Sequence, residues 1–156
     1  MDDIKDLLAT EFRDKEARRQ YAVDFLNSHI ALQIKTLRQQ RNWSQTELAK
    51  LAGKHQSQIS AMESVDFSAW KISTLQKLAE AFDLALTVNF ESFGGFLDFL
   101  ASVDREALER PSFDADPAFS EEGQRAASTT GDALAPVIYF PGNPIDPTPL
   151  RIARNG

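Results

Sequence analysis

The sequence contains no cysteine, and this absence removes several kinds of chemistry from consideration. Without thiols, the chain of 156 residues forms no disulfide, binds no metal through thiolates and uses no cysteine nucleophile. Its two histidines are not accompanied by acidic residues at the spacing of zinc ligands. We therefore expect no metal and no cofactor.

Long apolar runs are also missing. No run approaches about 18 uninterrupted apolar residues, the length that a membrane-spanning helix needs. The chain starts Met1-Asp2-Asp3, which is acidic where a signal peptide carries basic residues. From these absences we expect a soluble, cytoplasmic protein of about one domain, with no membrane partner.

Proline is absent from the first 110 residues, because all seven prolines lie in the final 46. The net charge of −6 is also unevenly distributed: residues 1–28 carry −2, residues 29–93 carry +1 and residues 94–156 carry −5. Residues 29–62 carry +4, since Glu47 is opposed by Lys35, Arg38, Arg41, Lys50 and Lys54. The negative net charge of the whole chain argues against a nucleic-acid partner, whereas the basic excess of residues 29–62 favours one.

Apolar residues recur at helical spacing through most of the first 82 residues. This periodicity predicts a first helix over residues 4–26, with a break at Asn27-Ser28 and Ser28 as the cap of the next helix. A capping box, Ser44-Gln45-Thr46-Glu47, marks another helix start. The further helices are expected at residues 30–42, 44–53, 56–64 and 73–82, with shorter helical segments at 96–103 and 104–110.

The periodicity changes to two after residue 83. Leu84, Leu86, Val88 and Phe90 alternate with less apolar residues, which predicts a half-buried strand. A single strand cannot satisfy its own backbone groups, and no second convincing strand lies nearby. We therefore expect these four residues to mediate dimerisation by pairing with the same strand of another subunit.

The most informative stretch is a pair of short helices joined by a turn at Gly53. Ala49 is small enough to let the two helices approach, and Ile59 and Met62 provide the apolar contacts of the second helix. This is the geometry of a DNA-binding helix-turn-helix, in which the second helix enters the major groove.

At these residues the sequence resembles the phage-repressor, or XRE-type, helix-turn-helix transcriptional regulators. The resemblance covers residues 29–83 and rests on Gln45, Leu48, Ala49, Ala52, Gly53, Ile59, Met62 and Glu63. It implies a five-helix domain that binds double-stranded DNA, in a protein associated with the nucleoid. Lys54 departs from the family pattern, because the residue after the glycine is usually apolar.

The predicted fold is therefore mainly α, with a repressor-type core, an extra N-terminal helix, one strand and an irregular tail. The expected divisions are an N-terminal extension (1–28), the DNA-binding domain (29–83), a dimerisation segment (84–110) and an acidic, proline-rich, mostly disordered tail (111–156).

The outward side of the second helix is expected to read bases. The candidate base-reading residues are Gln56, Ser57, Ser60 and Ala61, of which Gln56 suits the N6/N7 edge of adenine. The resemblance places Gln45 against a phosphate, where the N-terminus of its helix helps. The other candidate phosphate-binding residues are Arg38, Arg41, Lys54, Gln58, Lys71 and Ser73.

The sequence leaves several functions open. The preferred interpretation is a dimeric repressor with a near-palindromic operator, and the alternative is an antitoxin that neutralises a toxin and represses its own operon. A protein-interaction module and a small helical protein whose turn happens to contain glycine are further alternatives. An enzyme is not expected, since no Gly-x-Ser-x-Gly elbow occurs and Gly94-Gly95 lacks the lysine of a phosphate-binding loop.

Overall fold

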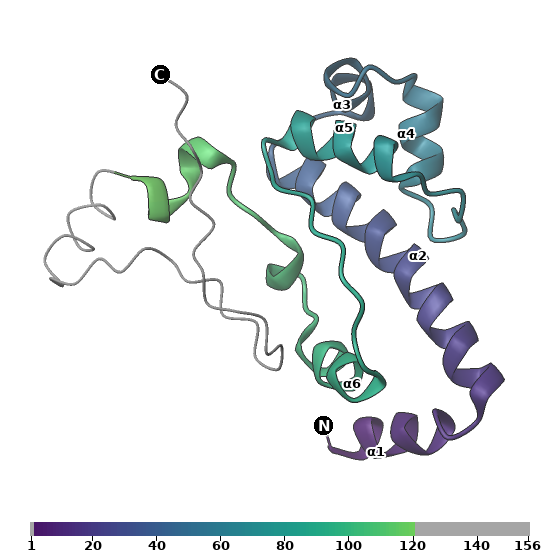
Figure 1. Ribbon diagram of the computed structural model, residues 1–156. Helices are drawn as coiled ribbons and strands as arrows, with labels where there is room; N and C mark the ends of the chain where they lie inside the picture. The colour runs from purple at the N-terminus through teal and green to yellow at the C-terminus, as the bar shows by residue number, and fades with distance from the viewer. Residues whose placement is uncertain (1, 121–156) are drawn as a thin grey trace, which may run out of the picture. The chain divides into compact units, whose positions relative to one another are not determined.

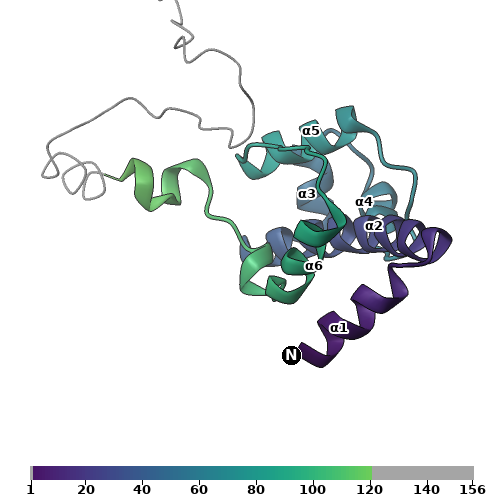
Figure 2. The same cartoon turned by 60° about the horizontal axis from the view of Figure 1, so that its bottom comes forward.

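The computed structural model describes residues 2–120, and the regular structure within them is helical throughout. The chain divides into two parts, Met1–Asp116 and Pro117–Gly156, and the α-helices of the described residues all lie in the first part (Figures 1 and 2). These helices are α1 (Asp2–Glu11), α2 (Lys15–Gln40), α3 (Gln45–Leu51), α4 (Gln56–Met62), α5 (Ile72–Phe82) and α6 (Phe93–Ser102). Over the described residues, none of them has the length and apolar character to span a bilayer.

Helix α2 corrects the sequence prediction at its start and in its middle. The chain breaks after α1, where Asp14 caps α2 by accepting a hydrogen bond from the Ala17 N–H at 2.8 Å. The break expected at Asn27-Ser28 does not exist, because α2 passes through both residues without interruption. Neither residue forbids helix, and packing on both sides of α2 outweighs their weak preference for helix ends. The division expected at residue 28 therefore falls inside a continuous helix.

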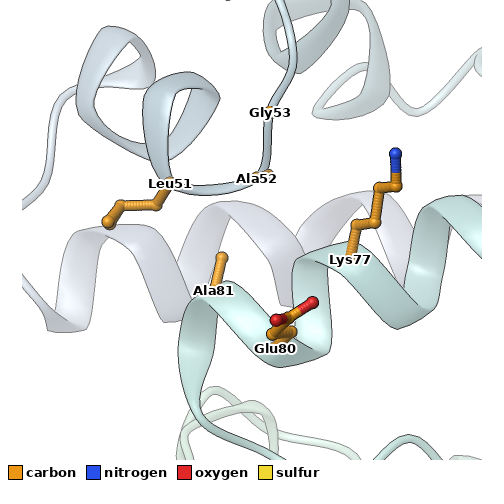
Figure 3. A pocket seen from close by; sticks show the side chains of 6 residues that line it. All are labelled: Leu51, Ala52, Gly53, Lys77, Glu80 and Ala81. Carbon is orange, nitrogen blue, oxygen red and sulfur yellow. The ribbon is translucent and has the colours of Figure 1, made fainter.

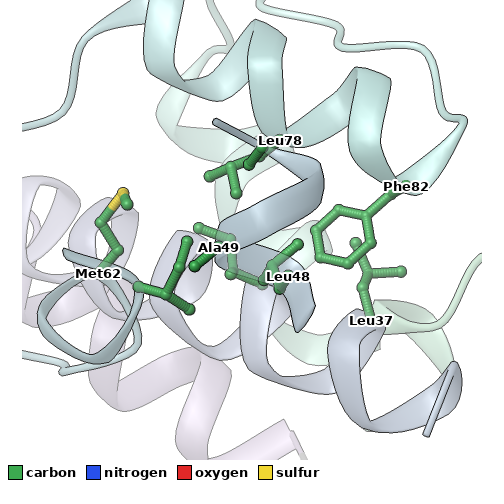
Figure 4. Close-up of a cluster of buried hydrophobic side chains, with 9 residues drawn as sticks. Leu37, Leu48, Ala49, Met62, Leu78 and Phe82 are labelled. Atoms are coloured by element: carbon green, nitrogen blue, oxygen red, sulfur yellow. The ribbon is translucent and has the colours of Figure 1, made fainter. Parts of the chain in front are cut away.

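The main hydrophobic core lies where α3, α4 and α5 pack around the C-terminal half of α2 (Figure 1). Leu48 and Ile59 are fully buried, and Figure 4 shows Leu37, Leu48 and Phe82 converging from three helices. The complete buried set is Ile34, Leu37, Leu48, Ala49, Ala52, Ile59, Met62, Leu78 and Phe82. Trp43, Phe67 and Trp70 are partly buried and pack against this core.

A second, aromatic cluster joins the N-terminal half of α2 to α1 and α6. Its centre is Phe12, which is 7% exposed and contacts Tyr21 and Phe96. The His29 ring stacks on the Phe25 ring with 5.3 Å between ring centroids, and it meets the Phe99 ring edge-on with 5.5 Å between centroids. An ion pair between Lys5 and Asp98 also links α1 to α6. The N-terminal extension thus belongs to a small aromatic unit built on the same long helix as the main core.

The segment expected to be a strand is not one in the described residues. After Asp83, which ends α5 with φ 55°, the chain runs to Ser92, the N-cap of α6, without helix or strand. Leu84 packs against the core, but Leu86, Val88 and Phe90 are exposed to 38%, 68% and 106%. The predicted half-buried strand is not formed within residues 2–120, where no other described segment pairs with it.

The chain after α6 also contains less helix than expected. The helical segment predicted at 104–110 is a single 3-10 turn, η1 (Glu106–Leu108), whose Leu108 is 2% exposed. Two further 3-10 turns follow, η2 (Phe113–Ala115) and η3 (Pro117–Phe119). The prediction of a disordered tail concerns mainly residues 121–156, which lie outside the described residues.

Candidate nucleic-acid interface

Helices α3 and α4 are joined by a tight turn at Gly53, which has φ +60°. The predicted capping box starts α3: the Glu47 N–H donates to the Ser44 hydroxyl, and the Ser44 N–H donates to the Glu47 carboxylate at 2.7 Å. Hydrogen bonds from the backbone and side chain of Ser44 lower the pKa of Glu47. The Lys54 N–H donates to the Ala49 carbonyl at 2.8 Å, so α3 ends at the turn.

A chain of side-chain hydrogen bonds connects the starts of α3 and α4. Nε2 of Gln56, the first residue of α4, donates to Oε1 of Gln45, the first residue of α3, at 2.8 Å. Nε2 of Gln45 donates in turn to a carboxylate oxygen of Glu63 at 3.0 Å. The two side-chain amides are therefore oriented with respect to each other. Within the described residues, the side-chain amide oxygen of Gln56 accepts no hydrogen bond from another part of the chain.

Glu63 lies at the C-terminal cap of α4 and is the most buried member of this network. Its side chain is 4% exposed and accepts two hydrogen bonds from Arg38, at 2.6 Å from Nε and 2.9 Å from Nη2. The remaining Arg38 nitrogen, Nη1, donates to the Trp43 carbonyl at 2.8 Å. The hydrogen bond to Glu63 raises the pKa of Arg38, which stays charged.

The four predicted base-reading residues are all exposed on α4. Gln56, Ser57, Ser60 and Ala61 recur at one-turn spacing, whereas Ile59 and Met62 of the same helix are buried in the core. The helix thus has an apolar side held by α3 and a polar side available to a partner. Small side chains on that side would allow close approach to a groove.

Apart from Gln45, the predicted phosphate-binding residues divide into two groups. Lys54 is half-buried beside the turn, and Lys71 and Ser73 are exposed at the N-terminus of α5. Gln58 is exposed, and its side-chain oxygen accepts a hydrogen bond from the His55 N–H at 2.9 Å, which caps α4. These four side chains lie near helix starts, where backbone N–H groups favour an anion.

Arg38 and Arg41 form the second group, and their guanidinium groups have hydrogen-bond partners inside the domain. All three nitrogens of the Arg38 guanidinium are used inside the domain, and its side chain is 13% exposed. Nη2 of Arg41 donates to the Phe82 carbonyl at 2.7 Å, and its guanidinium lies over the rings of Phe82 and Trp43. Burial lowers the pKa of Arg41. Both arginines hold helices together, so two of the five basic residues of residues 29–62 are engaged by partners inside the domain.

Sequence reasoning missed two features of this network. Glu63 was recognised only as a matching position, because its partner Arg38 lies 25 residues earlier in the chain. The bond between Gln45 and Gln56 was not predicted either, because eleven residues separate them and only the turn brings them together.

Figure 3 shows a pocket between the end of α3 and α5, lined by Leu51, Ala52, Gly53, Lys77, Glu80 and Ala81. None of the predicted DNA-contacting residues lines it, so it is not part of the candidate interface. Within residues 2–120 there is also no group of three or more His, Cys, Asp and Glu residues that could hold a metal ion.

Comparison with known proteins identifies the same region. A family model described as helix-turn-helix matches residues 34–89, which include the C-terminal part of α2 and all of α3, α4 and α5. Searches of curated proteins and of solved structures found no significant match. The matched residues contain the complete network of Arg38, Gln45, Gln56 and Glu63.

Proposed function

We propose that residues 34–89, which match the helix-turn-helix family model, form a DNA-binding domain of the XRE type, and that the protein is a sequence-specific repressor that binds a near-palindromic operator as a dimer. The supporting observation is the pair of oriented amides, Gln45 and Gln56, at the edge of an exposed polar helix face. The protein would act on chromosomal DNA in the nucleoid.

Helix α4 is the proposed recognition helix. Gln56 stands at its N-terminal end, and its amide can pair with the N6/N7 edge of adenine. Ser57 and Ser60 can exchange hydrogen bonds with either base of a pair, and Ala61 can contact a thymine methyl group. Gln45 reaches a phosphate while it holds Gln56 in place, so one side chain positions the protein and the other reads sequence.

The proposed phosphate contacts are those whose side chains remain available. Lys54, Lys71, Gln58 and Ser73 fit this role, whereas Arg38 and Arg41 are excluded from it. One recognition helix reads few bases, so a dimer that contacts two half-sites about one helical turn apart is expected. Repression would follow from occupancy of a promoter, including the protein's own.

Binding to the DNA upstream of the protein's own gene tests this proposal. Fluorescence anisotropy is measured on that DNA and on a scrambled duplex of equal length across a salt series. We expect selective binding, and the Gln56→Ala variant should lose about 1–3 kcal/mol of discrimination. Gln39→Ala, an exposed glutamine on α2, is the matched control. Equal affinity of the unaltered protein for both duplexes would refute the proposal.

An antitoxin remains the second candidate function. Ile4 and Leu7 on α1 are exposed to 66% and 65%, although DNA binding gives these apolar side chains no role. A protein partner at α1 would explain them. The deciding experiment expresses the product of the adjacent gene alone and together with this protein. Growth arrest that this protein relieves would favour the antitoxin, and normal growth in both cultures would exclude that gene product as its toxin.

A further inference from the structure

The connection between α5 and α6 has the properties of an unpaired strand. Within the described residues, the backbone N–H and C=O groups of residues 85–90 make no hydrogen bond to other backbone groups. Figure 1 shows this connection as a long path from the end of α5 to α6. Exposed extended backbone of this kind offers a row of donors and acceptors to another strand.

The side chains of this segment expose apolar surface. Val88 is 68% exposed and the Phe90 side chain is completely exposed, whereas both belong to an alternating apolar series that begins at Leu86. Thr87, Asn89 and Glu91 occupy the intervening positions. In a strand, alternate residues share one face, so the segment has one apolar and one polar face.

We propose that two copies of the chain pair through residues 85–91 as an antiparallel ribbon, with Val88 opposite Val88 of the partner subunit. This interface rests on the proposed dimeric repressor and specifies how its two halves join. The apolar faces of the two strands lie on the same side of the ribbon only if the twofold axis is perpendicular to the ribbon. In that arrangement one residue of each strand stands opposite its own copy in the partner subunit.

Length and charge select Val88 as that residue. Asp83 and Ser92 bound the segment, and pairing centred on Val88 uses all of residues 85–91. Pairing centred on Thr87 would place Asp83 directly opposite Glu91 of the partner subunit, and like charges in that position are destabilising. Centring on Val88 places Glu91 opposite Ala85 of the partner subunit and Leu86 opposite Phe90 of the partner subunit. This register removes the direct charge conflict and pairs the two larger apolar side chains.

The absence of native cysteine allows the register to be measured directly. Opposite residues of an antiparallel pair have Cα atoms about 4.5–5.5 Å apart, within the range that a disulfide spans. Val88→Cys should therefore form a covalent dimer under mild oxidation. Leu86→Cys and Phe90→Cys should each remain uncrosslinked alone, because each residue lies about 14 Å from its own copy. Mixing these two variants should produce the crosslinked heterodimer.

The uncrosslinked protein provides the second measurement, its mass in solution by light scattering. We expect a dimer that Val88→Asp converts to a monomer, while Val23→Asp, at a valine of α2 that is 53% exposed, leaves it dimeric. Crosslinking at Thr87→Cys or Asn89→Cys instead of Val88→Cys would overturn the register. A monomeric native protein, or dissociation by Val23→Asp alone, would overturn the interface.

These outcomes are separable from failure of the proposed function. A monomer that still prefers one half-site sequence would support the DNA-binding proposal and refute the antiparallel ribbon. A Val88-linked dimer with no sequence preference would retain the ribbon and remove the repressor.

Discussion

The Arg38 guanidinium and the Glu63 carboxylate form a two-point ion pair, with nitrogen–oxygen distances of 2.6 and 2.9 Å. The pair fastens the last turn of the domain's longest helix, α2, to the C-terminal end of α4. Because Glu63 also accepts a hydrogen bond from Gln45, the same carboxylate fixes the amide that holds Gln56. Arg38 therefore supports the proposed interface from inside the domain.

Removal of Glu63 should destabilise the fold strongly. In Glu63→Ala the Arg38 guanidinium would remain largely buried without its partner, and such losses cost about 3–5 kcal/mol. Urea denaturation followed by circular dichroism measures this change. The double variant Arg38→Met with Glu63→Leu should recover much of the loss, because no buried charge is left. If Arg38→Met weakened DNA binding with no loss of stability, the phosphate role of Arg38 would be restored.

Gly53→Ala should destabilise the protein through backbone conformation alone. Gly53 has φ +60°, and a Cβ built there meets no atom within 4 Å, so no clash arises. The left-handed conformation costs an ordinary residue about 1–2 kcal/mol. Gly53→Asn should lose less, since asparagine tolerates this region better. Equal losses for both variants in chemical denaturation would contradict this explanation.

The stability of the aromatic cluster should fall with acidification. Burial, and to a lesser extent the charge of Arg110, lower the pKa of His29 below its ordinary value of 6.5. Since the folded protein favours the neutral ring, this contribution is complete above pH 6.5 and is lost as the pH falls toward the lowered pKa. The melting temperature of the native protein should therefore fall more between pH 7.5 and pH 5 than that of His29→Phe. Parallel curves would show that His29 carries no pH dependence.

Salt dependence should distinguish the two classes of basic residue. Each lysine that contacts a phosphate is present twice in a dimer, so Lys54→Ala or Lys71→Ala should reduce the slope of log K against log salt by about 1.8. Arg41→Met should leave the slope unchanged and lower stability by about 2 kcal/mol, because it removes the bond to the Phe82 carbonyl and the stacking on two rings. A change of slope with Arg41→Met would place that residue at the DNA.

The sequence predicted best where its signals were local. The capping box at Ser44, the turn at Gly53 and the apolar spacing of Ile59 and Met62 placed α3 and α4 within about two residues of their observed bounds. The break at Asn27-Ser28 was wrong because helix preference at those residues is weak and contacts of α2 with two separate clusters outweigh it. The predicted strand is not formed within the described residues. The alternation of apolar and polar residues gives a segment one apolar face, but it supplies no partner strand.

The sequence by itself determined the helix-turn-helix, since helix starts, the glycine turn and the apolar positions are all encoded within a few neighbouring residues. It also determined which charges are available to fold or function, but not how they are used. Only the tertiary structure decided that Arg38 and Arg41 serve the interior, because their partners Glu63 and Phe82 lie 25 and 41 residues away along the chain. The net charge of +4 over residues 29–62 includes two arginines whose charged groups pack inside the domain. A basic side chain is available to a partner only where the fold leaves it without an internal one.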